Sequence, residues 1–221
     1  MSDFRDEFIS FAISKNVLCF GEFRTKAGRM SPYFFNAGLF NDGDSLRKLG
    51  QFYAKAITAA ELQFDTLFGP AYKGIPLVSA IAIAFAEMGQ NVPFCFNRKE
   101  VKDHGEGGNL IGAPLAGRVL IVDDVISAGT SVRESVHHIH EAGAEPYGVA
   151  IALDRMERGN GMLSATQEVQ QVYGIKIINI INLDDILSYL RNRKDFARHL
   201  HAVEDYRARY GIDECRERDP R

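Results

Sequence analysis

The stretch that decides the fold of this 221-residue chain is Val119-Leu120-Ile121-Val122-Asp123-Asp124-Val125-Ile126-Ser127-Ala128-Gly129-Thr130-Ser131. Its four apolar residues predict a strand, and the two carboxylates that follow mark the end of that strand. Small residues then predict a short loop, and a helix is expected to begin near Thr130. A strand without polar alternation is typical of a parallel sheet that is covered on both faces.

The same order of strand, loop and helix recurs on both sides of this stretch. Short apolar runs predict the other strands at 66–68, 92–96, 147–153 and 175–181. This alternation indicates an α/β fold with a mostly parallel central sheet flanked by helices. Because such sheets bind ligands at the carboxyl ends of their strands, the informative loops are those after Phe68, Phe96, Val122 and Leu153.

The two ends of the chain follow other patterns. Phe4, Phe8, Phe11 and Ala12 recur at helical spacing, and two short strands are predicted at 18–23 and 33–36. A long helix capped by the pair at 44–45 is expected next. The charged stretch from 195 onward has few apolar anchors, which predicts a surface helix that ends in a frayed tail.

Composition excludes several classes of protein. A net charge of -3 and a pI of about 6.1 argue against a protein that binds nucleic acid or membranes through bulk charge. The three cysteines form no disulfide or zinc pattern. The acidic N-terminus differs from a signal peptide, and the longest apolar stretch, between Lys73 and Glu87, is interrupted by Pro76. We therefore expect a soluble cytoplasmic protein that binds neither nucleic acid nor membrane.

The loop after the acidic pair has the composition of a phosphate site. Small residues allow backbone N–H groups to approach an anion, and the N-terminus of the following helix adds partial positive charge. The carboxylates repel phosphate but suit hydroxyl groups or magnesium-bound water, so a ribose 5-phosphate fits the whole stretch. One alternative is a strand and helix whose acids only cap the helix. Another is the acidic pocket of a response regulator, which would not need the run at 127–130.

The stretch at 98–117 combines cations with many glycines. Arg98, Lys99, Lys102 and His104 are followed by five glycines within the thirteen residues from Gly105 to Gly117. This composition predicts a mobile lid that places cations over a polyanion. A solvated charged loop is the alternative, because acidic residues in the same stretch cancel the local charge.

Together these segments resemble the type I phosphoribosyltransferases, and among them the bacterial orotate phosphoribosyltransferases. The resemblance runs in unbroken order over about residues 4 to 210. The acidic-pair motif alone specifies only the superfamily. The further segments that carry the resemblance lie at 20–23, 26–29, 31–38, 68–76, 96–108 and 153–159.

The resemblance implies a type I phosphoribosyltransferase fold in a single domain, 1–221. A small N-terminal hood of a helix and strands, about 1–40, would contribute to the base site. The core that binds phosphoribosyl pyrophosphate (PRPP) would span about 65–182. The flexible catalytic lid would span about 98–117.

The resemblance also implies a reaction. The 5-phosphoribosyl group of PRPP would pass to N1 of orotate, giving orotidine 5′-monophosphate and pyrophosphate in de novo pyrimidine synthesis. Inversion at C1′ would proceed through an oxocarbenium-like state. Mg²⁺ would be held mainly by PRPP rather than by side chains, with Asp123 and Asp124 as candidates for contact through water. A homodimer would share the lid across its interface.

Residue roles follow from the matching positions. Lys102 would stabilise the departing pyrophosphate, with His104 and Lys99 assisting, and Asp124 joins the catalytic set. The residues expected to bind PRPP are Lys26, Tyr72, Lys73, Arg98, Lys99, Lys102, His104, Asp123, Asp124, Val125, Ile126, Ser127, Ala128, Gly129, Thr130 and Ser131. The residues expected to bind orotate are Lys26, Phe34, Phe35, Ser127 and Arg155, the last through the substrate carboxylate.

Several of these positions have plainer explanations. Lys73 has the pattern of an exposed lysine at a helix start, and Phe34 and Phe35 have that of strand residues packed in a core. Ser127 replaces the threonine usual in the family and retains the hydroxyl. The histidines at 137, 138 and 140 lack the spacing of metal ligands. A phosphoribosyltransferase for another base and a non-catalytic PRPP sensor are the rival functions.

Overall fold

The computed structural model describes residues 3–25, 28–102, 108–159 and 161–212. Its centre is a six-stranded sheet of order β5-β4-β3-β6-β7-β8, in which only the β4–β5 pair is antiparallel. The strands are β3 (Thr66–Gly69), β4 (Phe94–Lys102), β5 (Gly108–Gly112), β6 (Arg118–Val122), β7 (Glu145–Asp154) and β8 (Lys176–Asn182). The predicted, mostly parallel sheet is confirmed.

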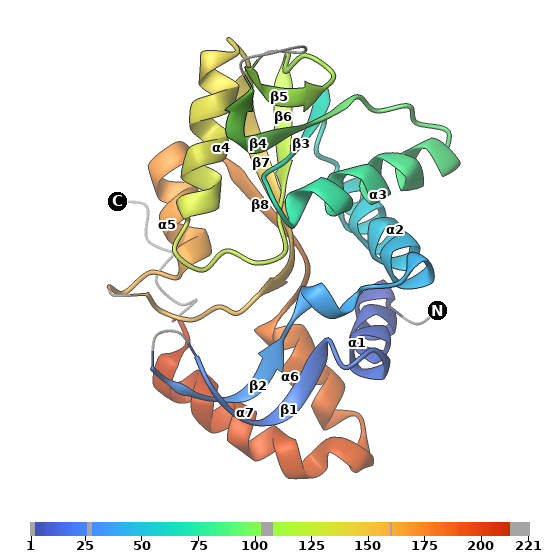
Figure 1. Ribbon diagram of the computed structural model, residues 1–221. Coiled ribbons are helices and arrows are strands. Elements are labelled where there is room, and N and C mark those ends of the chain that lie inside the picture. Colours follow the sequence, from blue (N-terminus) through green and yellow to red (C-terminus); the bar gives the residue numbers. More distant parts are fainter. Residues whose placement is uncertain (1–2, 26–27, 103–107, 160, 213–221) are drawn as a thin grey trace.

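Helices cover both faces of this sheet (Figure 1). On one side lie α2 (Gly43–Ala59) and α3 (Gly74–Glu87), and on the other lie α4 (Thr130–Glu141) and α5 (Ala165–Tyr173). Alternate residues of β6 point into two separate cores: Leu120 and Val122 join one cluster, and Val119 and Ile121 join the other. The strand is therefore uniformly apolar because both of its faces are buried.

A second layer of structure stands beside the sheet. The antiparallel hairpin of β1 (Leu18–Arg24) and β2 (Met30–Phe35) packs with α1 (Phe4–Ser14), α6 (Leu183–Arg191) and α7 (Ala197–Tyr210). Figure 1 shows these elements together below the main sheet. A short 3-10 turn at Ala37–Leu39 leads from β2 to α2, and another at Lys194–Phe196 joins α6 to α7.

The C-terminal helix differs from its prediction as a surface helix. Val203 and Tyr206 are buried, and α7 packs against β2 and α6. These two apolar residues lie three positions apart on one helix face, which is enough to anchor the helix among its charged neighbours. The tail predicted to fray beyond it lies outside the described residues.

The predicted start of helix α2 and the predicted end of strand β4 also differ from the structure. Helix α2 begins at Gly43 and is capped by Asp42, whose Oδ1 accepts a hydrogen bond from the Ser45 N–H at 2.8 Å. Strand β4 continues to Lys102 and pairs with β5, so both flanks of the predicted lid are strands. The tip of that stretch, 103–107, lies outside the described residues. Within the part of the chain that is described, no helix is both long and apolar enough to cross a membrane.

The turn that leaves β3 depends on a glycine. A Cβ at Gly69 would lie 2.2 Å from the Gly74 carbonyl oxygen and 2.8 Å from Val78 Cβ. We expect Gly69→Ala to lower the free energy of unfolding by about 2 kcal/mol or more, because the backbone on both sides must move. For a chain of this size that corresponds to a drop in Tm of roughly 4–8 °C in thermal unfolding.

Gly43→Ala is the matched control for this substitution. A Cβ at Gly43 meets no atom within 4 Å, so the variant should keep the wild-type Tm or exceed it slightly. Equal Tm values for the two variants would show that the tight approach at Gly69 is not needed.

Candidate active site

The predicted functional loops meet at one edge of the sheet. β3 and β7 are the neighbours of β6, and all three run parallel, so their carboxyl ends lie side by side. Two backbone hydrogen bonds extend the β6–β7 ladder past Val122, from Asp123 N–H to Ala150 and from Ala152 N–H to the Asp124 carbonyl. The acidic pair is therefore held by main-chain hydrogen bonds at the carboxyl end of the parallel strands.

Both carboxylates of the pair are buried. Asp124 N–H donates to Asp123 Oδ1 and Val125 N–H donates to Asp124 Oδ1, each at 2.9 Å. Burial, together with the negative charge of Asp124, raises the pKa of Asp123 to about 6. Two adjacent buried carboxylates at the carboxyl end of a strand are suited to binding hydroxyl groups of a ligand.

Lys73 supplies a positive charge to the same place. It stands at the start of α3, and its Nζ lies 2.5 Å from Asp124 Oδ2. Its side chain is 60% exposed, which leaves the ammonium open to solvent on the ligand side. Lys73 is therefore an exposed lysine at a helix start, as its plainer explanation had it, and it is also paired with the acidic motif.

The loop after the acidic pair has the geometry of an anion site. Gly129 adopts a φ of 68°, the left-handed region that favours glycine, and α4 begins at the next residue. Ser127, Ala128 and Thr130 are exposed, and the first turn of α4 contains no acidic residue. Open backbone N–H groups at a helix N-terminus are suited to binding phosphate.

Strand β4 contributes to the neighbouring loop. Lys99 Nζ lies 5.3 Å from the centre of the exposed Tyr72 ring, and Asn97 Oδ1 accepts a 2.7 Å hydrogen bond from Ala71 N–H. Arg98 follows on the same strand, and its Nη1 is buried without a hydrogen-bond partner. Lys99 is thus near the Tyr72–Lys73 loop, while the structure gives Arg98 no contact there. The roles of both cations stay predictions.

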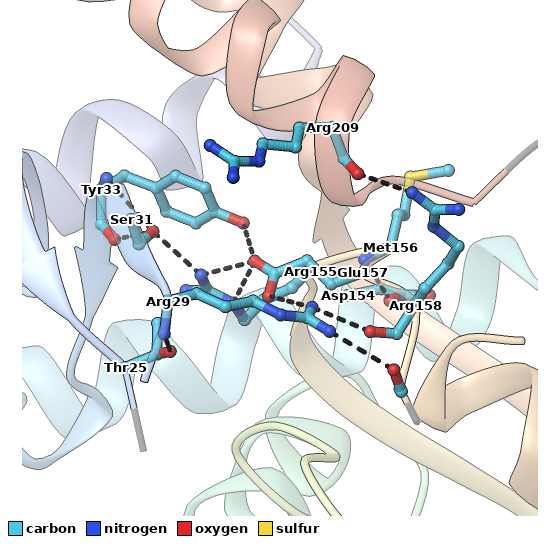
Figure 2. A network of polar contacts seen from close by, with 11 residues as sticks. Thr25, Arg29, Ser31, Tyr33, Asp154, Arg155, Met156, Glu157, Arg158 and Arg209 are labelled. Carbon is cyan, nitrogen blue, oxygen red and sulfur yellow. Dashed lines mark hydrogen bonds and ion pairs between the residues drawn. The ribbon is translucent and has the colours of Figure 1, made fainter. Parts of the chain in front are cut away.

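Arg155 follows β7 and reaches toward the hairpin (Figure 2). Its Nε donates to Glu157 Oε1 at 2.8 Å, and its Nη2 donates to Ser31 Oγ at 3.0 Å. The guanidinium also lies over the Tyr33 ring, 4.3 Å from its centre. The predicted carboxylate-binding arginine is therefore already ordered by residues of β2 and of its own loop.

The two phenylalanines point in different directions, as expected for consecutive strand residues. Phe34 is 44% exposed and stacks on Phe23 with ring centres 5.5 Å apart. Phe35 packs against the main hydrophobic core. Only Phe34 is placed to offer an open aromatic face, and the core interpretation holds for Phe35.

Three predicted residues cannot be placed fully. Lys26 and His104 lie outside the described residues. Only the backbone of Lys102 is described, at the end of β4 opposite Gly108. Their roles stay predictions.

The structure adds residues to which the sequence assigned no role. The Tyr53 hydroxyl on α2 donates to the Asp123 carbonyl at 2.7 Å and supports the acidic pair from below. Asn97 and Glu157 were part of the quoted segments but had no function attached. In the sequence, Asn97 and Glu157 are recognisable only as polar residues near strand ends. That feature does not distinguish a residue that supports the site from one that is exposed to solvent.

The oxygen atoms of the acidic pair are the side-chain groups of this site that could contact a magnesium ion. Among the described residues no three histidine, cysteine or carboxylate groups gather to form a metal site. Asp123 and Asp124 offer the oxygen ligands that Mg²⁺ prefers, but Asp124 is paired with Lys73. The pair fits a cation that brings most of its own ligands.

Comparison with known proteins agrees with this geometry. The model of the phosphoribosyl transferase domain matches residues 39–169, so fold and site define that class of protein. An orotate phosphoribosyltransferase of Nitrosospira multiformis is 77% identical over 210 residues, which cover 95% of this chain and 92% of that protein. The chain belongs to the orotate phosphoribosyltransferase family of enzymes.

Solved structures show the same fold. The crystal structure of orotate phosphoribosyltransferase from Francisella tularensis is 40% identical and superposes with a TM-score of 0.85, covering 93% of this chain and 99% of that one. The Mycobacterium tuberculosis enzyme, solved in complex with PRPP, is 21% identical with a TM-score of 0.60 and covers 82% of this chain and 97% of its own. The second likeness is one of fold.

Proposed function

We propose that this protein transfers the 5-phosphoribosyl group of PRPP to N1 of orotate, forming orotidine 5′-monophosphate and pyrophosphate. The reaction serves pyrimidine biosynthesis. The observation that carries the proposal is the buried Asp123–Asp124 pair directly before the exposed loop and the N-terminus of α4. One end of this arrangement suits ribose hydroxyls and the other suits a 5′-phosphate.

The residues on both sides of this pair have distinct tasks. Asp123 and Asp124 hold the ribose hydroxyls, and their negative charge stabilises the positive charge that develops on the ring at C1′. Residues 125–131 bind the 5′-phosphate, largely through backbone N–H groups. Tyr72 and Lys73, with Lys99 beside them and Arg98 on the same strand as Lys99, bind the pyrophosphate group.

Magnesium fits the site as a companion of PRPP. When bound, Mg²⁺ neutralises charge on the pyrophosphate and so favours its departure. The oxygen atoms of PRPP would supply most of its ligands, and Asp123 and Asp124 would be the protein groups to contact it through water. Two carboxylates, one of them already paired with Lys73, offer too few ligands to hold the ion without PRPP.

Orotate is bound from the hairpin side. Arg155 binds the substrate carboxylate, Phe34 presents its exposed face to the base, and Lys26 and Ser127 complete the contacts. An arginine fork matches a carboxylate in geometry and charge, which distinguishes orotate from bases that lack this group. The hairpin within about residues 1–40 thus contributes to the base site beside a PRPP-binding core of about 65–182.

The remaining parts of the proposal concern the lid and the assembly. Residues 98–117 close over PRPP and carry Lys102 and His104 to the pyrophosphate. In a homodimer the lid reaches the partner's active site, so both subunits complete each site. The enzyme works in the cytoplasm.

A panel of bases tests the substrate. With PRPP and Mg²⁺ present, orotate should release pyrophosphate, while uracil, the same ring without the carboxylate, should react at least ~100-fold more slowly. Arg155→Ala should lower the reaction rate with orotate and leave the rate with uracil unchanged, so the ratio of the two rates should fall. Equal rates with uracil would contradict the role of Arg155, and a preference for adenine would favour a phosphoribosyltransferase for another base.

A further inference from the structure

We infer that Glu157 is a positioning residue that holds the Arg155 guanidinium in the orientation required to bind the substrate carboxylate. The inference rests on the proposed function, since it presumes that Arg155 meets orotate. Glu157 itself touches no substrate in this account. It acts through Arg155.

Glu157 grips one edge of the guanidinium. Arg155 Nε lies 2.8 Å from Glu157 Oε1, and Nη2 lies 2.5 Å from the same oxygen. Nη2 also donates to Ser31 Oγ on β2. Nη1 takes no part in these contacts, so its end of the planar fork is directed away from Glu157.

Glu157 is in turn held by two residues of the hairpin. The Tyr33 hydroxyl donates to Oε1 at 3.3 Å, and Arg29 Nη1 lies 3.9 Å from Oε2. Burial raises the pKa of Tyr33 well above its usual value, so this hydroxyl stays a donor. Figure 2 shows the carboxylate of Glu157 enclosed by these partners.

Arg29 is fixed by the loop that carries Glu157. Its Nη1 donates to the Arg158 carbonyl at 2.8 Å and its Nη2 to the Gly159 carbonyl at 3.3 Å. The same guanidinium lies over the Tyr210 ring of α7, 4.9 Å from its centre. The network therefore joins the hairpin, the loop after β7 and the C-terminal helix around one carboxylate.

The charges in this network favour positioning over competition with substrate. Two arginines surround one glutamate, so the cluster keeps a net positive charge that attracts an anion. The side chains of Glu157 and Arg155 are only 15% and 23% exposed, so an Arg155 without its partner would turn toward another acceptor. A misdirected fork loses the parallel hydrogen bonds that a carboxylate requires.

The experiment measures steady-state kinetics of Glu157→Gln and Glu157→Ala in the full-length enzyme. We expect Glu157→Gln to raise the KM for orotate about tenfold, with kcat and the KM for PRPP within about twofold of wild type. Glu157→Ala removes both acceptor oxygens and should raise the orotate KM further. Direct binding of PRPP to each variant verifies that the site remains folded.

Glu204→Gln is the matched control. Glu204 pairs with Arg191 through a 2.7 Å contact at an exposed position, and its loss should leave both KM values unchanged. Wild-type kinetics in Glu157→Gln, tighter orotate binding, or equal losses for orotate and PRPP would each overturn the inference. Lack of orotate turnover by the wild-type enzyme would instead refute the proposed function, so the two failures are distinguishable.

Discussion

Lys102→Ala is expected to lower kcat by a factor of about 10²–10³ while the Kd for PRPP changes by less than about threefold. The physical reason is that the negative charge on the leaving pyrophosphate develops during the reaction. Negative charge on the bridging oxygen grows only as the bond to C1′ breaks, so a cation aimed at it stabilises the transition state more than the bound substrate. Single-turnover rates and direct PRPP binding separate the two effects.

Lys176→Ala is the control for the loss of one lysine. Lys176 is exposed and begins β8, at the edge of the sheet opposite the functional loops, so its removal should change neither quantity. If Lys102→Ala weakened PRPP binding as much as it slowed turnover, Lys102 would be a ground-state ligand only.

Asp123→Asn is expected to reduce kcat/KM by about 100-fold and at the same time to stabilise the protein above neutral pH. The loss of activity follows from replacing a charged acceptor of a ribose hydroxyl by a neutral one. The amide keeps the Oδ1 that accepts from Asp124 N–H, so the local fold should survive.

The effect on stability follows from the raised pKa. Asp123 has a pKa of about 6 in the folded protein against 3.8 for an ordinary aspartate, so between these values the unfolded chain ionises first. The folded protein therefore loses stability as pH rises through this window and carries the full penalty above it. Asn cannot ionise and avoids a penalty of about 1–3 kcal/mol.

Urea unfolding of both proteins at several pH values measures this difference. The advantage of Asp123→Asn should grow from about pH 4 to about pH 6 and then remain constant. The groups that face Asp123, namely Asp124 with its partner Lys73, together with Tyr53 and Ser131, are the same in both proteins. An advantage that does not vary with pH would contradict a strained, buried carboxylate at this position.

Local pattern was sufficient to predict the sheet and the loops at its edge. The run 119–122 is buried on both faces, which accounts for its uniformly apolar composition. Asp123 and Asp124 were identified because charged residues directly after such a strand must lie at its open end. Lys73 was ambiguous in the sequence, since its pairing with Asp124 joins residues 51 positions apart.

The supporting residues could not be predicted for the same reason. Tyr53 contacts Asp123 from helix α2, 70 positions away in the sequence, and Glu157 meets Tyr33 and Arg29 of a distant hairpin. The sequence around Tyr53 and Glu157 does not identify these distant partners. Helix α7 was misjudged because two buried residues suffice to anchor it when the hairpin offers a complementary apolar face.

The most direct test of the central claim is the absorbance of orotate in a mixture of the full-length protein, PRPP and Mg²⁺. We expect orotate absorbance to fall at a rate proportional to enzyme concentration. We also expect one pyrophosphate released for each orotate consumed, with orotidine 5′-monophosphate as the product. Unchanged orotate absorbance at every pH where the protein stays folded would contradict the assignment.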